Sequence, residues 1–246
     1  MTTKDVLCRH FSRIGARVRI RAPGLRQREK FIVDVVKDRR GELFELRCVD
    51  EVEPEILDVR PSSHHLVLMV RDGKVKNKYL LGRDERHWFA AAVPGDNVRD
   101  VRTAIDSLRP DEVVGCEVIR QGEWFFVPKP GVSFTGLPVL RNEPLSRGNG
   151  SKPHMCEELV RTGGVTVMVS QKYPTGLDLA AYEKLIASDS KAQRAFWRRM
   201  VRDAEVFARG KVRHADHRTI YLDGWHRVYM NRERFAPHAV QVAFLD

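Results

Sequence analysis

Residues 64–80 of this chain read HHLVLMVRDGKVKNKYL, two alternating runs that meet at Asp72 and Gly73. Asp-Gly between alternating runs is a strong short-range signal for a hairpin with a two-residue turn. That turn pairs Arg71 with Lys74, which places four charges on one face: Arg71, Lys74, Lys76 and Lys78. The other face is apolar and carries Leu66, Leu68, Val70, Val75, Tyr79 and Leu81. Like charges on one face of a sheet repel one another, so the hairpin favours an anionic partner.

Similar alternation recurs along the whole sequence. Hairpins are predicted at residues 31–48, at 113–127 and at 218–230, where Asp223 and Gly224 form the expected turn. Helices are predicted after Thr2, after Pro94, at residues 178–187 and at 190–208. The predicted class is α+β, with mostly antiparallel sheets built from hairpins and about four helices.

One segment interrupts this pattern. Residues 131–153 are rich in Gly, Pro, Ser and Asn and contain only one short apolar run. Such composition is typical of a linker or a functional loop. We therefore predict an N-terminal α+β lobe at residues 1–130, a loop or linker at 131–153 and a C-terminal α+β lobe at 154–246. A chain of 246 residues can also pack these lobes as one domain.

Composition narrows the class of protein. The 43 lysines and arginines exceed the 33 acidic residues, which gives a net charge of +10 and favours nucleic acid or another acidic partner. No apolar run has the length of a signal-peptide core or of a membrane span, so no membrane partner is expected. The four cysteines are far apart in sequence. A cytoplasmic protein with reduced thiols is the expectation.

Three basic stripes are the candidate nucleic-acid-binding residues. They lie on a predicted strand near the N-terminus, on the hairpin quoted above and on the predicted helix at 190–208. Their members are Arg17, Arg19 and Arg21; Arg71, Lys74, Lys76 and Lys78; and Lys191, Arg194, Arg198 and Arg202. Guanidinium groups bind phosphate in bidentate fashion, so Arg-rich stripes suit phosphate contacts. The alternative is that each stripe is a solvated face that keeps the protein soluble.

No zinc finger, RNA-recognition strand or helix-turn-helix accompanies the stripes. The expected binding is therefore to the backbone or shape of RNA or of a structured duplex, without readout of bases.

A second constellation is His214-Ala-Asp-His217. With Ala215 and Asp216 as a turn, the imidazoles of His214 and His217 become cross-strand neighbours about 5 Å apart. Asp216 can then orient one ring or act as a third metal ligand. His214, Asp216 and His217 are thus the candidate catalytic residues, with a divalent metal ion as an alternative to acid–base chemistry. A polar hairpin end whose histidines bond to backbone or solvent explains the same residues.

The segment 141–164 is a third candidate site. It places Gly148, Gly150 and Lys152 close together, and glycines beside basic residues can hold phosphate through backbone N–H groups. The spacing does not match a P-loop, because Lys152 precedes proline. His154 with Glu157 or Glu158 forms a base with a carboxylate to orient it. A surface loop is the alternative.

Three strings together resemble an uncharacterised bacterial protein family. They are residues 84–93, residues 120–128, and residues 213–220 with 224–228. The resemblance spans most of the chain and implies a bacterial cytoplasmic protein. It assigns no activity, cofactor or catalytic residue.

These observations support three hypotheses. The leading one is a nucleic-acid-binding protein that uses basic stripes for phosphate contacts and needs no cofactor. The second is a metal-dependent or His-based hydrolase or nuclease acting on a phosphate-containing substrate, with its histidines near the segment 141–164. The third is a subunit of a larger protein assembly, such as a ribonucleoprotein or defence complex.

Overall fold

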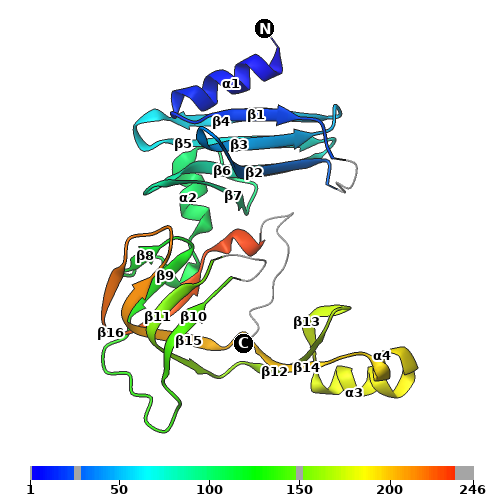
Figure 1. Cartoon of the computed structure of the whole chain (residues 1–246), viewed down its shortest axis with the longest axis vertical. Helices are drawn as coiled ribbons and strands as arrows, with labels where there is room; N and C mark the ends of the chain where they lie inside the picture. Colours follow the sequence, from blue (N-terminus) through cyan, green and yellow to red (C-terminus); the bar gives the residue numbers. More distant parts are fainter. Residues whose placement is uncertain (1, 25–28, 148–151, 236–246) are drawn as a thin grey trace. The chain divides into compact units, whose positions relative to one another are not determined.

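The computed structural model describes residues 2–24, 29–147 and 152–235 (Figure 1). The chain divides into two compact units. Among the described residues, the first unit ends at Val114 and resumes at Asn231, and the second unit runs from Gly115 to Met230. The division falls at Val114 rather than near residue 130. Part of the expected linker, residues 140–145, is a strand in the main sheet of the second unit.

The first unit contains two sheets and two helices. In the three-stranded sheet, ordered β1-β3-β2, β1 runs parallel to β3 and β2 runs antiparallel to it. The second sheet is an antiparallel meander, β4-β5-β6-β7. The bounds are β1 (Val18–Arg21), β2 (Phe31–Asp38), β3 (Gly41–Cys48), β4 (Val52–Arg60), β5 (His65–Asp72), β6 (Val75–Asp84), β7 (His87–Val93), α1 (Thr3–Arg13) and α2 (Val101–Leu108). Short 3-10 turns form η1 (Pro61–Ser63), η2 (Asp111–Val113) and η3 (Arg232–Phe235).

The hairpin predicted at residues 64–80 exists as β5 and β6, but its turn lies one residue further along. Asp72 pairs with Val75, so Gly73 and Lys74 are the loop residues and Arg71 pairs with Lys76. Gly73 has a φ of 58°, and a positive φ at the first loop residue is what a type II′ turn requires. The loop still has two residues, so the pairing between the strands shifts by two positions. Because side chains alternate between faces, each one stays on the face that the sequence predicts.

Both faces of this hairpin are covered. Leu66, Leu68 and Val70 pack with α1 and the first sheet in one core. Val67 and Leu80 lie on the same face as the charges and pack with α2 in a second core. The charged face is therefore solvent-exposed only toward the turn, at Lys74 and Lys76.

The second unit contains a six-stranded antiparallel sheet, ordered β10-β11-β15-β16-β9-β8, and a smaller sheet, β13-β12-β14. The main sheet comprises β8 (Ile119–Gln121), β9 (Trp124–Pro128), β10 (Leu140–Leu145), β11 (His154–Thr162), β15 (Glu205–Arg213) and β16 (Ile220–Met230). The smaller sheet and two helices form an insert between β11 and β15: β12 (Val165–Ser170), β13 (Tyr173–Asp178), α3 (Leu179–Ser188), α4 (Ser190–Arg194) and β14 (Arg198–Arg202).

The α+β class and its mostly antiparallel sheets are confirmed, and the described residues contain four α-helices. Two local predictions are wrong. The helix expected at 190–208 ends at Arg194, and the chain then forms β14 and the start of β15. The hairpin expected at Asp223 and Gly224 is a bulge, because β16 continues through both residues and pairs with β15 and β9.

None of the helices in the described ranges combines the length and the apolar character that crossing a bilayer requires.

Glu45 is a buried carboxylate on β3 that pairs with two arginines of the first basic stripe, Arg19 and Arg21. It contacts Arg19 at 2.6 Å, Arg47 at 3.0 Å and Arg21 at 3.6 Å. Burial raises the pKa of Glu45, but the hydrogen bond from Arg19 and the surrounding arginines outweigh it and leave the pKa below its ordinary value.

We expect Glu45→Gln to lower the free energy of unfolding by roughly 1–3 kcal/mol, because it leaves these arginines without their shared counter-charge. Urea denaturation at neutral pH measures the loss. Glu55→Gln is the matched control, since Glu55 forms only an exposed 3.4 Å pair with Arg71 and its loss should cost less than about 1 kcal/mol. Equal losses in the two variants would contradict this assignment.

Candidate metal centre

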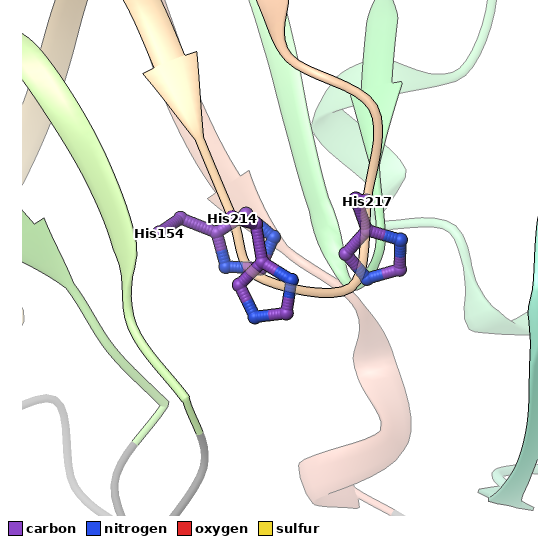
Figure 2. A group of neighbouring side chains, drawn as sticks. All are labelled: His154, His214 and His217. Carbon is purple, nitrogen blue, oxygen red and sulfur yellow. The ribbon is translucent and has the colours of Figure 1, made fainter.

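Three histidines meet at one end of the main sheet in the second unit (Figure 2). His154 begins β11, and His214 and His217 belong to the loop between β15 and β16. One ring nitrogen from each lies within 4.8 Å of the others. The rings stack, with centroid distances of 4.1 Å for His154–His214, 4.7 Å for His214–His217 and 5.6 Å for His154–His217.

Strand register explains why residues 60 positions apart meet. Met155 pairs with Arg213 in the antiparallel β11–β15 ladder, so the next position outward places His154 beside His214. The loop itself is tied to β8, because the Gln121 side-chain amide donates to the carbonyl of Arg218 at 2.6 Å. Backbone pairing and this amide together set the position of all three rings.

His154 is the most unusual member of the cluster. Its side chain is 1% exposed, and neither ring nitrogen has a hydrogen-bond partner among the described residues. Buried polar atoms without partners are costly, so such a side chain points to a ligand. Burial, together with the neighbouring His214 and His217, lowers the pKa of His154 to about 3.

His214 is held by two backbone groups. The N–H of Asp216 donates to Nδ1 at 3.1 Å, so the neutral ring carries its proton on Nε2, which lies 3.2 Å from the carbonyl oxygen of Lys152. Burial and His217 lower the pKa of His214. Because the pKa values of His154 and His214 are both lowered, these rings are neutral near pH 7, the form in which imidazole binds metal.

Gly122 allows two of the rings to approach the backbone closely. It is the first loop residue of the β8–β9 turn, with a φ of 58°. A Cβ at this position would lie 2.9 Å from Nε2 of His217 and 3.4 Å from Nε2 of His154. The two Nε2 atoms thus border a volume that a side chain at residue 122 would occupy.

The cluster is close to a metal site in distance but not in orientation. Tetrahedral coordination at 2.0–2.1 Å places ligand nitrogens roughly 3.3 Å apart, shorter than the 4.8 Å span here. The stacked rings must also tilt so that their nitrogens converge, and His214 must exchange one backbone bond.

Asp216, predicted as a third ligand or orienting group, has another role. Its carboxylate accepts two hydrogen bonds from Nζ of Lys152, at 2.7 and 2.8 Å. The proximity of His214 and His217 agrees with the sequence prediction, whereas the third imidazole comes from His154. Its location at the start of a strand in the segment 141–164 was the available signal, but the sequence does not reveal which strand it pairs with. The glycine-rich residues 148–151 of that segment lie outside the described residues.

The first basic stripe is used in ion pairs. Arg17 forms two hydrogen bonds with Asp38 and lowers the pKa of that carboxyl group to about 2. Arg19 and Arg21 share Glu45.

The second stripe is divided. Arg71 pairs with Glu55, and Lys78 is buried with its ammonium 2.5 Å from the carbonyl oxygen of Asp96. Lys74 and Lys76 are exposed.

The third stripe is not helical throughout. Lys191 and Arg194 lie on α4, and Arg198 and Arg202 lie on β14. Arg202 donates to the carbonyl oxygens of Thr175 and Gly176. Five of the eleven predicted cations therefore have neither a side-chain acceptor nor a buried position in the described ranges. They are Lys74 and Lys76 at the β5–β6 turn, Lys191 and Arg194 on α4, and Arg198 on β14.

No protein-family model matches the chain, and neither curated proteins nor solved structures provide a match.

Metal-free protein should lose stability on mild acidification because of His154. Between pH 6.5 and 3 the unfolded chain protonates this imidazole while the folded protein does not, so the free energy of unfolding falls as pH falls. From pH 7 to 5 we expect a loss on the order of 2 kcal/mol, measured by urea denaturation with a chelator present. His154→Leu should show a smaller loss over the same interval, and an identical pH dependence in both proteins would contradict the assignment.

Proposed function

We propose that this protein is a metal-dependent hydrolase of a phosphate-containing substrate, in which His154, His214 and His217 hold one divalent transition-metal ion. The observation that carries the proposal is the buried, unpartnered imidazole of His154, whose Nε2, like Nε2 of His217, lies against the position that a Cβ at residue 122 would take. A set of three imidazoles suits zinc and similar ions, whereas magnesium and calcium prefer oxygen ligands. Three protein ligands also leave a coordination position for water, as catalytic zinc sites require.

The surrounding charges favour a phosphate ester as the substrate. Three cations lie beside the site along the chain: Arg213 and Arg218 adjoin its histidines, and Arg120 lies two residues before Gly122. Arg120 donates to the carbonyl oxygen of Gly122, whereas Lys152 is already held by Asp216. Guanidinium groups bind phosphoryl oxygens. A metal ion held by His154, His214 and His217 would supply an activated water for hydrolysis of the ester P–O bond, and the proton released by that water would balance the one taken up by the leaving oxygen.

The metal site is tested first by titration. Full-length protein treated with a chelator should bind one zinc ion per chain in isothermal titration calorimetry. His217→Ala, which removes a half-buried ring, should weaken zinc binding by roughly 100-fold or more, and His154→Ala and His214→Ala should do the same. His10→Gln removes a histidine from α1 in the other unit and should bind zinc as the unaltered protein does. One-to-one binding that survives the triple alanine variant would contradict the site.

Hydrolysis is tested on the same proteins. The zinc-loaded protein should hydrolyse 4-nitrophenyl phosphate or bis(4-nitrophenyl) phosphate, and His217→Ala should lose that activity while His10→Gln keeps it. A fully loaded protein that hydrolyses neither ester would contradict the catalytic part of the proposal and leave a structural metal site.

Gly122 offers an independent test of the position proposed for the ion, because it lies beside His154 and His217. Gly122→Ala places a methyl group 2.9 Å from Nε2 of His217 and must displace that ring, so zinc affinity should fall by roughly 10-fold or more. Gly73→Ala is the matched control, because Gly73 has the same φ of 58° and no atom within 4 Å of the added carbon. Both variants should lose roughly 1–2 kcal/mol of unfolding free energy through backbone strain. An unchanged zinc affinity in Gly122→Ala would contradict the proposed position of the ion.

A further inference from the structure

The insert at residues 163–204 has a thin core (yellow to amber in Figure 1). Among its large apolar side chains only Val167 is fully buried, and α3 has no buried residue. Its packing depends instead on three aromatic rings. Trp197 stacks on Tyr173 with a centroid distance of 5.7 Å and meets Tyr182 edge-on at 5.0 Å.

Trp197 anchors the segment that joins α4 to β14. In addition to its two ring contacts, its indole N–H donates to the carbonyl oxygen of Ala192 at 2.8 Å. With Trp197 turned into the insert, its neighbour Phe196 is 81% exposed, the highest value among the exposed large hydrophobic side chains of the described residues. An apolar ring this exposed contributes little to the stability of the fold, so its position calls for another explanation.

Three arginines lie within three residues of Phe196 along the sequence. Arg194, Arg198 and Arg199 are all exposed, and none forms an ion pair within the described part of the chain. The nearest acidic residues along the sequence are used elsewhere. Asp189 caps α4 by accepting from the backbone N–H groups of Lys191 and Ala192, and Asp203 pairs with Arg202. These charges differ from the first basic stripe, whose arginines all contact carboxylates.

We propose that residues 194–199 bind single-stranded nucleic acid. Phe196 stacks on an unpaired base, and Arg194, Arg198 and Arg199 contact the adjacent phosphates. An exposed ring with exposed arginines on both sides of it in the sequence supplies both parts of single-strand recognition, a stacking platform and backbone neutralisation. A base pair within a duplex cannot offer its face to the ring, so single strands are favoured over duplexes. This inference is independent of the metal centre and goes beyond the proposed hydrolysis.

Fluorescence anisotropy tests the inference with full-length protein and a labelled oligouridylate of about 16 nucleotides, a length at the upper end of single-module site sizes. Phe196→Ala should weaken binding roughly 5- to 100-fold, the range that follows from losing one base stack. The logarithm of the affinity should fall with the logarithm of salt concentration at about −0.7 per phosphate contact, or about −2 for three arginines. The same sequence in a duplex should bind more weakly.

Three controls separate stacking from general charge and from apolar contact. Leu179→Ala removes another exposed apolar side chain of the insert and should leave the affinity unchanged. Phe196→Trp should retain binding, whereas Phe196→Leu, which keeps apolar surface without a ring, should lose most of it. Arg198→Glu with Arg199→Glu should weaken binding more than Lys74→Glu with Lys76→Glu, which changes the net charge equally at the β5–β6 turn.

Several results would overturn the inference. Equal losses of affinity in the Arg198/Arg199 and Lys74/Lys76 double variants would show that the oligonucleotide responds only to net charge. Unchanged affinity in Phe196→Ala would exclude stacking of a base on Phe196. Retention of affinity by Phe196→Leu would also exclude it. Binding to vesicles of phosphatidylcholine and phosphatidylglycerol, in a Phe196-dependent manner and without binding to the oligonucleotide, would assign the segment to membrane surfaces instead. Circular dichroism of each variant distinguishes these outcomes from loss of folding.

Discussion

The antiparallel pairing of β11 with β15 is the constraint on which both candidate sites depend. At one end of this ladder, the Met155–Arg213 pair places His154 against His214. At the other end, the Thr162–Glu205 pair brings together the two points where the insert leaves and rejoins the sheet. A one-residue slip in register would turn His154 to the opposite face, because side chains alternate along a strand. The buried Leu159 and Val160 hold the register by burying one side chain on each face.

Folding neutralises part of the positive charge that the sequence carries. A net charge of +10 describes the whole sequence, but the partners of each cation determine what it can bind. Arg17, Arg19 and Arg21 satisfy carboxylates within the first unit, and Lys78 is buried against a carbonyl oxygen. A cation already held by a carboxylate loses much of its attraction for an external phosphate. The exposed arginines beside Phe196 carry no such competing contact among the described residues.

Local sequence signals succeeded where neighbouring residues alone set the conformation. The capping box formed by Thr2 and Asp5 begins α1, and Asp178 caps α3. Gly73 and Gly122 each produce a tight turn, although both occupy the first loop position. Asp223 and Gly224 carry the same kind of signal, yet they form a bulge within β16, because β15 pairs with the residues on either side of them. The ladder with β15 outweighs the preference of a dipeptide for a turn.

The basic ladder after Ser190 fails as a helix for a related reason. The helical spacing is real, but β14 pairs along its length with β12, and Asp203 adopts a φ of 58° that no α-helix tolerates. Residue types and short-range spacing therefore sufficed for the α+β class, the approximate strands and the His214–His217 pair, since each depends on near neighbours. The partnership of His154 with that pair, the exposure of Phe196 and the neutralisation of the first arginine stripe arise from contacts between distant segments. Such contacts depend on strand order and register, which periodicity along a single chain does not encode.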